Sequence, residues 1–212
     1  MTDSWQPEPI ANGWLGGRLR WSDRTVSSRP LVIKIGGSLL NRSGWPMLVG
    51  DLIAAESAGQ RLVHLIVGGG PIVDGLRQID QVEPQPADQM HRLAIAAMSL
   101  TAEVVAGQLG LPRVTDLNAA TSGVLDISRS STCLAAIAAL PCNWTVTSDS
   151  IAAAVAASTN AELLLAKSVV PQTSAIPSLV ATGWLDGYFA TASNNLSSIR
   201  WATPAVERSG LR

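Results

Sequence analysis

The chain has 212 residues, of which 47% are hydrophobic and 15% charged, and its formal net charge is −1. This length fits one domain of ordinary size, and the apolar composition excludes a chain that is disordered throughout. The near-neutral charge, spread without a dense basic run, argues against nucleic acid as a partner.

Residues 1–28 carry no period of 2 or 3.6 that would define a strand or a helix, and they are interrupted by proline and glycine. This pattern predicts an irregular arm, followed by one domain over residues 29–212. Trp5, Trp14 and Trp21 are too many large apolar side chains for a fully solvated tail. We therefore expect the arm to lie on the domain or on a neighbouring subunit.

An alternation of strands and helices begins at Leu31. Leu31–Ile35 and Leu62–Val67 are short apolar runs that end in glycine, which is typical of buried strands entering a turn. Helical patterns follow each of them, over Trp45–Ala58 and from Ile72 onward. Strand, helix, strand, helix predicts an α/β fold with a parallel sheet and helices on both of its faces.

The rest of the chain continues this alternation, with a long helix over Asp88–Leu109 and a buried strand over Leu163–Lys167. Four shorter elements are predicted between them: a strand near Arg113–Thr115, a helix over Cys133–Leu140, a strand over Thr145–Thr147 and a helix over Ser148–Ser158. Beyond Lys167 the sequence is broken and polar, so we expect short strands at most.

Two of the apolar strands end in small residues, Gly36-Gly37-Ser38 and Gly68-Gly69-Gly70. The carboxyl ends of parallel strands share one edge of a sheet, so both turns would face one crevice. Backbone without Cβ atoms can approach a ligand closely, and its N–H groups can bind phosphate oxygens. Either turn alone could be only a tight turn, but the pair favours anion binding.

Two lysines and an aspartate stand next to these turns. Lys34 lies in an apolar strand, where a charge is costly without an anionic partner, and Lys167 ends another such strand. Each lysine alone could equally be an edge side chain that reaches solvent, and Asp149 could be only a helix cap. On one sheet edge, however, the lysines would flank a transferring phosphoryl group and Asp149 would hold both in position.

The histidines and cysteines point to no metal or redox site. His64 lies in an apolar strand and His91 on a core-bearing helix, and no Cys, Asp or Glu stands near them at ligand spacing. We expect two structural histidines with satisfied hydrogen bonds. Cys133 and Cys142 have no redox or metal spacing, which is typical of reduced thiols, and no secretory or membrane-spanning segment is evident. These features predict a cytoplasmic protein with no membrane partner.

Taken together, these residues resemble the amino-acid-kinase superfamily, which includes acetylglutamate, aspartate, glutamate and uridylate kinases. The match covers about Leu31 to Lys167. It rests on three runs, the last of them followed by Lys167: Val32-Ile33-Lys34-Ile35-Gly36-Gly37-Ser38-Leu39, Val67-Gly68-Gly69-Gly70-Pro71 and Thr147-Ser148-Asp149-Ser150-Ile151-Ala152-Ala153. The resemblance implies a three-layer α/β/α sandwich with a mostly parallel central sheet, which usually assembles as a homo-oligomer.

The resemblance also implies the roles of individual residues. Lys34 and Lys167 would be catalytic and stabilise the phosphoryl group, while Asp149 would organise them. Residues 36–38, Gly36, Gly37 and Ser38, would approach the phosphates of ATP. The acceptor, a small phosphate compound, would be held by Gly69, Gly70 and Ser148, and Mg²⁺ would be carried mainly by the nucleotide rather than by a protein metal site.

Within the superfamily, the run from Trp144 to Ala153 resembles most the small kinases that phosphorylate aminomethylfuran phosphate in methanofuran biosynthesis. Residues 183–189, Gly-Trp-Leu-Asp-Gly-Tyr-Phe, also resemble the closing motif of that group. The reaction implied is ATP-dependent conversion of a phosphomonoester to a diphosphate.

The chain departs from the superfamily after Lys167. Many members carry an Asp-x-Asp-Gly loop there that lines the nucleotide site, whereas this chain reads Ser168-Val169-Val170-Pro171-Gln172. This difference leaves two alternatives open. One is a non-catalytic binding or storage protein on the same fold, and the other is a subunit that acts only with a partner.

Overall fold

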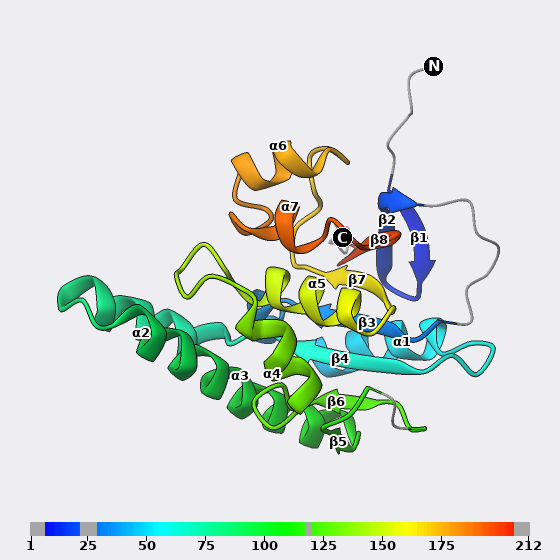
Figure 1. Cartoon of the computed structure of the whole chain (residues 1–212). Helices are drawn as coiled ribbons and strands as arrows, with labels where there is room; N and C mark the ends of the chain where they lie inside the picture. The colour runs from blue at the N-terminus through cyan, green and yellow to red at the C-terminus, as the bar shows by residue number, and fades with distance from the viewer. Residues whose placement is uncertain (1–6, 22–28, 118–119, 206–212) are drawn as a thin grey trace, which may run out of the picture.

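The computed structural model describes residues 7–21, 29–117 and 120–205. Within them the strands form one sheet in the order β1-β2-β8-β7-β3-β4-β6-β5 (Figure 1). The strands are β1 (Glu8–Ala11), β2 (Trp14–Trp21), β3 (Leu31–Ile35), β4 (Val63–Val67), β5 (Arg113–Val114), β6 (Gly123–Leu125), β7 (Glu162–Ala166) and β8 (Ser198–Pro204). From β8 to β5 neighbouring strands run parallel, whereas β1 and β2 pair antiparallel with their neighbours.

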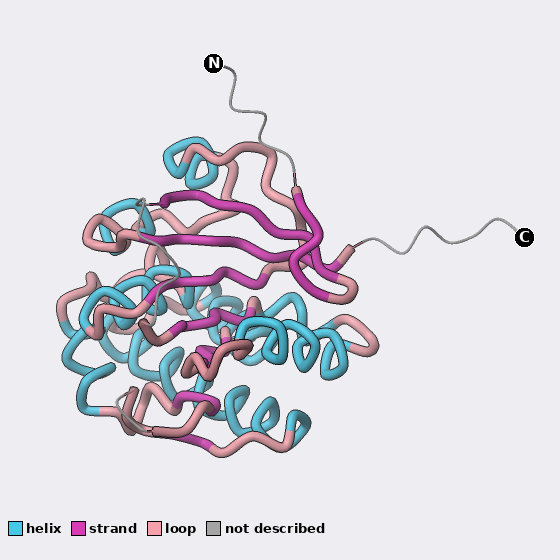
Figure 2. Tube along the Cα trace, turned by 90° about the vertical axis from the view of Figure 1, so that its right-hand side faces the viewer, coloured by secondary structure: helices cyan, strands magenta, loops and turns pink. Residues whose placement is uncertain are grey.

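Helices cover both faces of this sheet (Figure 2). They are η1 (Gly37–Asn41), α1 (Trp45–Glu56), α2 (Gly70–Val82), α3 (Ala87–Leu109), α4 (Ser131–Ala138), α5 (Ser148–Ser158), α6 (Ile176–Ala181) and α7 (Phe189–Ala192). The helices α1 and α3 pack on one face, and α4, α5 and α7 lie on the other. The predicted three-layer α/β/α sandwich with a mostly parallel sheet is confirmed.

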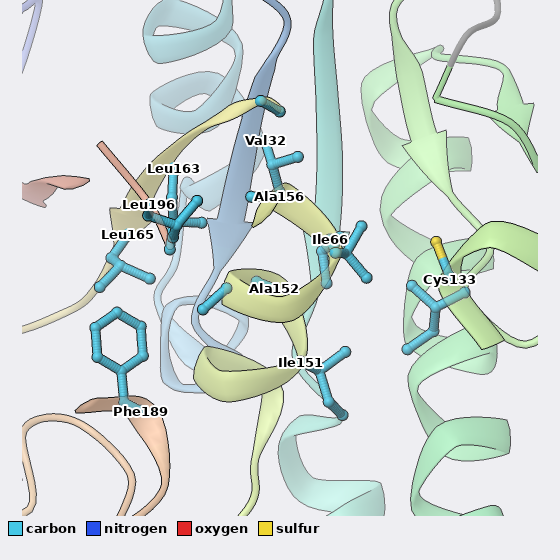
Figure 3. Packing of buried hydrophobic residues seen from close by; sticks show 14 of the residues in the cluster. Val32, Ile66, Cys133, Ile151, Ala152, Ala156, Leu163, Leu165, Phe189 and Leu196 are labelled. Atoms are coloured by element: carbon cyan, nitrogen blue, oxygen red, sulfur yellow. The ribbon is translucent and has the colours of Figure 1, made fainter. Parts of the chain in front are cut away.

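The central strands have both faces buried, which explains why they read as continuous apolar runs. In β3 every residue is buried, and alternate side chains point to opposite faces. Ile33 packs with the cluster on the α1 and α3 side, whereas Val32 packs against Ala152 and Ala156 of α5 (Figure 3). Each fully buried Ile or Leu stabilises the fold by about 1.5–3 kcal/mol relative to an exposed side chain.

The expectation of an irregular N-terminal arm is wrong for residues 7–21. They form β1 and β2, and β2 pairs with β8, so this hairpin extends the central sheet. Trp14 is buried and its indole N–H donates to the Leu48 carbonyl at 2.7 Å. Trp5 lies outside the described residues, so the part of the prediction that concerns it is not addressed.

Three further local expectations are corrected. Thr145–Thr147 is a turn and a helix cap rather than a strand. The Thr147 carbonyl accepts a hydrogen bond from Ile151 of α5, and the Thr145 carbonyl accepts one from Tyr188. The strand β6 was not predicted, and β8, with seven residues, is longer than the short strands expected after Lys167. His64 is buried in β4, where neither ring nitrogen makes a well-aligned hydrogen bond within the described residues, although the Thr121 backbone approaches the ring, so the expected full hydrogen bonding is not met.

One helix of the described chain, α3, is long and apolar enough to cross a membrane by length and composition alone. A helix that packs along a sheet has the same composition, and this is the position of α3. Its residues Ala102, Val105 and Ala106 belong to the core on that face of the sheet.

Candidate active site

The carboxyl ends of β3, β4 and β7 meet at one edge of the sheet, because β3 pairs in parallel with both of the others. The turns at residues 36–38 and 68–70 leave this edge, and Lys167 follows β7 there. The Gly36 N–H donates to the Ala166 carbonyl at 2.8 Å, which ties the first turn to the end of β7. The predicted convergence of the two turns and the second lysine is therefore present.

The two glycine turns pack directly against each other. A Cβ on Gly37 would lie 2.7 Å from the Cα and the N of Gly70, so only glycine fits there. Gly70 has a φ of +52°, a left-handed conformation that other residues adopt rarely. It begins α2, and none of the described side chains caps this helix at Gly69. The first N–H groups of α2 are thus left for an anion at the sheet edge.

Asp149 lies between the two predicted catalytic lysines. It is the second residue of α5 and only 4% exposed. Its Oδ1 forms an ion pair with the Lys34 Nζ at 2.8 Å, and its Oδ2 accepts a hydrogen bond from the Lys167 Nζ at 2.7 Å. Lys34 is itself 5% exposed, so the Asp149 carboxylate offsets one of the two ammonium charges and leaves the cluster with one net positive charge.

Burial and charge act in opposite directions on this cluster. Burial alone would raise the pKa of Asp149, but the ammonium groups of Lys34 and Lys167 outweigh it and hold that pKa below its ordinary value. Burial lowers the pKa of Lys167, and the neighbouring Asp149 carboxylate only partly opposes that change. Asp149 is therefore a carboxylate at neutral pH and a poor proton acceptor.

Lys167 has two further partners from a later segment. Its Nζ donates to the Trp184 carbonyl and lies 4.5 Å from the centre of the Trp184 ring, which is a cation–π contact. The Trp184 indole N–H donates to the Val169 carbonyl at 2.9 Å, so the ring is held from its other side. The role of Trp184 was not predicted, although it belongs to the motif noted at residues 183–189.

The substituted segment after Lys167 contacts the first glycine turn. The hydroxyls of Ser38 and Ser168 lie 2.9 Å apart and share a hydrogen bond. Ser168 begins the segment in which the sequence departs from the resemblance, so a neutral hydroxyl lies beside the turn.

A cavity of about 610 Å³ opens from the glycine turns. Its lining includes Gly37, Ser38, Gly69, Gly70, Ser148, Asp149 and Asp186, whereas Gly36, Lys34 and Lys167 are not among its lining residues. Ser148 faces the second turn, its hydroxyl 2.9 Å from the place of a Cβ on Gly68. Apolar side chains line much of the rest: Val73, Met90, Ile95, Met98, Trp144, Ile151 and Leu185.

A polar group lies on the wall of this cavity that α2 provides. The Trp144 indole N–H donates to Asp80 at 2.7 Å, and the Arg77 guanidinium lies 5.1 Å from the Trp144 ring centre. Arg77 also pairs with Asp74 at 2.9 Å. Sequence reasoning missed these residues, and the only available signal was the i, i+3 spacing that places Asp74, Arg77 and Asp80 along one side of α2.

Among the described residues, no group of three or more His, Cys, Asp or Glu side chains is placed to hold a metal ion. The nine predicted site residues all lie at or next to the same sheet edge. Their individual roles remain predictions.

Comparison with solved structures shows the same fold in known kinases. Uridylate kinase from Archaeoglobus fulgidus superposes with a TM-score of 0.60 at 17% identity, over 83% of this chain and 91% of that one. Aspartate kinase from Synechocystis superposes with a TM-score of 0.53 at 16% identity, over 84% of this chain but 40% of the larger enzyme. No curated protein matches the sequence. The Amino acid kinase family matches residues 29–172, and the chain belongs to that family.

Proposed function

We propose that the protein is a small-molecule phosphotransferase that moves the γ-phosphoryl group of ATP to the phosphate of a phosphomonoester. Aminomethylfuran phosphate is the specific acceptor that the sequence resemblance suggests. The observation that carries the proposal is the position of Asp149 between Lys34 and Lys167, beside two glycine turns at one sheet edge.

This arrangement suits transfer to an oxygen that is already anionic. In the reaction the bond from the γ-phosphorus to the bridging oxygen of ADP breaks, and a bond to an acceptor oxygen forms. A phosphomonoester has a second pKa of about 6, so its oxygen needs no deprotonation at neutral pH. Asp149, bound by two lysines, is not available as a base, which favours an anionic acceptor over an alcohol.

The lysines supply positive charge where the transition state spreads negative charge over the phosphoryl oxygens. Asp149 holds their ammonium groups in position and also lines the cavity beside them. The turn at Gly36, Gly37 and Ser38 would hold the nucleotide phosphates, because its close packing against Gly70 leaves little but backbone at the surface. With no metal cluster among the described residues, we propose that Mg²⁺ arrives on the phosphates of ATP and adds to their neutralisation.

The cavity supports an acceptor with an apolar ring. Among its lining residues, Gly69, Gly70 and Ser148 suit the acceptor phosphate, and Met90 and Met98 add apolar surface. Methionine adapts to flat aromatic bodies and contacts them favourably. A furan ring that bears a phosphate offers both an anionic group and an apolar ring to this lining, which a free amino acid does not.

The experiment is an assay of ADP release with Mg-ATP and a panel of acceptors: aminomethylfuran phosphate, UMP, aspartate, glutamate and an aliphatic phosphomonoester. We expect release that depends on aminomethylfuran phosphate and that Lys34→Met abolishes. Release with aspartate or glutamate and none with phosphate esters would contradict the proposed acceptor class. No release with any acceptor would contradict the kinase proposal itself.

A second function, non-catalytic binding, is favoured by one feature. Ser168 and its successors replace the acidic loop, and Lys167 is already held by Trp184. Calorimetric titration with Mg-ATP separates the two functions. Binding of the acceptor without any binding of ATP would favour the binding protein.

A further inference from the structure

Asp186 accepts hydrogen bonds from five donors. Its Oδ2 accepts from the Thr147 N–H at 2.9 Å, the Thr147 hydroxyl at 2.8 Å and the Ser150 N–H at 2.9 Å. Its Oδ1 accepts from the Ser150 hydroxyl and from the Tyr188 N–H, the latter at 3.2 Å. A carboxylate offers about four lone-pair positions. These five hydrogen bonds fill the acceptor positions of the Asp186 carboxylate.

With these contacts Asp186, which lies far along the chain from α5, caps the N-terminus of that helix. In a capping box, a Glu or Gln at the third helical position reaches back to the N–H of the N-cap residue. In α5 the N-cap is Thr147 and the third position is Ser150, whose short side chain donates to Asp186 instead. Asp186 accepts from both backbone N–H groups, and its negative charge lies at the positive end of the helix.

The turn that Asp186 caps carries Asp149. Asp149 stands between Thr147 and Ser150, with its carboxylate oxygens 2.8 Å and 2.7 Å from the two lysine nitrogens. A tilt of this turn would move the carboxylate away from at least one of them. The segment that supplies Asp186 also holds Lys167, through the Trp184 carbonyl and ring.

The core fixes this segment in turn. Leu185 and Phe189 are buried on either side of Asp186 (Figure 3 shows Phe189 beside Leu165). The Tyr188 N–H also donates to the Thr145 carbonyl at 3.1 Å. Through its hydrogen bonds, Asp186 thus fixes the first turn of α5 relative to this packed segment.

We propose that Asp186 is a positioning residue for phosphoryl transfer: it holds the first turn of α5 so that Asp149 stays between Lys34 and Lys167. Its catalytic consequence rests on the proposed function. Its structural consequence, the placement of Asp149 against the lysines, does not.

The test compares Asp186→Ala with the double variant Asp186→Ala/Ser150→Glu. The double variant recreates a capping box within the helix, with Thr147 at the N-cap and a glutamate side chain at the third helical position, and it occupies the space that the missing carboxylate leaves. We expect kcat of Asp186→Ala to fall by about 10- to 100-fold, the cost of misplacing a catalytic group by up to about 1 Å, with KM for ATP and acceptor little changed. Ser150→Glu should restore most of this loss.

A matched control removes a cap elsewhere. Ser130 caps α4 through its hydroxyl, which accepts from the Cys133 N–H at 3.2 Å. Ser130→Ala should lower the melting temperature and leave kcat unchanged. If Asp186→Ala does not fold, Asp186→Asn, which keeps the shape but loses one acceptor oxygen, is used in its place.

A second measurement needs no substrate. Competitive acetylation of Lys34 and Lys167 with acetic anhydride across pH, followed by mass spectrometry, reports how closely Asp149 pairs with each amine. The charge of Asp186 itself also raises the pKa of Lys167, so the reporter is Lys34, which pairs with Asp149 at 2.8 Å. We expect greater acetylation of Lys34 in Asp186→Ala than in the parent, and parental acetylation in the Asp186→Ala/Ser150→Glu double variant and in Ser130→Ala. This readout decides the inference even if the parent releases no ADP, an outcome that would contradict only the proposed function.

Two results would overturn the inference. One is a Lys34 labelling profile of Asp186→Ala identical to that of the parent. The other is a higher KM for the acceptor with kcat unchanged, because that would place Asp186 in contact with substrate.

Discussion

Asp149 is one negative charge between two positive ones, and its replacement by Asn should be among the most damaging single changes in the chain. Lys34 is 5% exposed, and the Lys167 side chain is 16% exposed, so both ammonium groups would be left buried beside each other. Removing one partner from a buried ion pair costs about 3–5 kcal/mol. We expect the free energy of unfolding of Asp149→Asn, measured in urea, to fall by about this amount, together with loss of phosphoryl transfer.

The control for that substitution is Asp88→Asn. Asp88 pairs with Arg92 on the surface of α3 at 2.5 Å, with both side chains more than half exposed. Water screens such a pair, so the urea midpoint should change far less than in Asp149→Asn, although Asp88 also lies in the first turn of α3. If Asp149→Asn were as harmless as Asp88→Asn, the lysines would not depend on Asp149 for their charge balance.

Lys167 should set the alkaline limit of activity. Burial lowers its pKa below the ordinary value of 10.5, and Asp149 only partly offsets this effect. The protonated ammonium group is the form that stabilises the phosphoryl group. We therefore expect kcat/KM, which reports the ligand-free enzyme, to fall as pH rises through this lowered pKa, that is, at a pH below 10.5.

The comparison variant for the pH profile is Lys167→Arg. Arginine stays protonated over the accessible range, so its weaker activity should show no alkaline decline between neutral pH and the ordinary lysine pKa. A parent profile that stays flat to that pH would contradict the assignment of Lys167.

At the scale of elements, the two glycine turns depend on mutual contact. A Cβ at position 37 would lie 2.7 Å from the Gly70 backbone, so Gly37→Ala must push η1 and the start of α2 apart. We expect a loss of about 1–3 kcal/mol of stability, as for other overpacked sites, and higher KM values for both ATP and acceptor. Urea unfolding and steady-state kinetics measure these effects.

Gly75→Ala is the control within the same elements. A Cβ at Gly75, in α2, would meet nothing within 4 Å. Because alanine loses less backbone entropy than glycine in a helix, this variant should gain about 0.4–1 kcal/mol. Opposite signs for the two substitutions are expected, and a Gly37→Ala variant as stable as Gly75→Ala would show that the turns have room to separate.

The strands that the sequence predicted well are those in which every residue is buried. β3 and β7 are five-residue runs with every residue buried, and their apolar composition is visible without knowing their neighbours. β2 was missed because Gly16 and Gly17 are typical of a loop. In the structure a Cβ on Gly17 would lie 2.8 Å from the Trp201 indole of β8, and one on Gly16 would lie 2.6 Å from the Ile10 side chain of β1, so these glycines make room for side chains of both neighbouring strands.

The same distinction holds at the site. Lys34, Asp149 and Lys167 were predicted because each stands in a recognisable run, and the structure brings them together. The contacts of Asp186 with Thr147 and Ser150 were not predictable from spacing, because a loop some 36 residues away supplies the acceptor. A distant partner of this kind leaves no periodic signal in the sequence.

For the whole molecule, the N-terminal hairpin joins the two ends of the described chain in one sheet. β2 pairs antiparallel with β8, which itself lies beside β7. Trp14 fills the core on the side of α1 and is 1% exposed. The hairpin therefore covers an edge that would otherwise expose the backbone of β8.

Truncation of Trp14 tests whether this hairpin belongs to the folded unit. Trp14→Ala removes a fully buried indole and its hydrogen bond to Leu48, so the free energy of unfolding should fall by about 3–5 kcal/mol in urea. Val82→Ala, at a side chain that is 84% exposed, should leave the midpoint almost unchanged. If both variants unfold together with the parent, the hairpin is an appendage. A single cooperative transition shifted only by Trp14→Ala means that residues 7–21 fold as one unit with the sheet that carries the site.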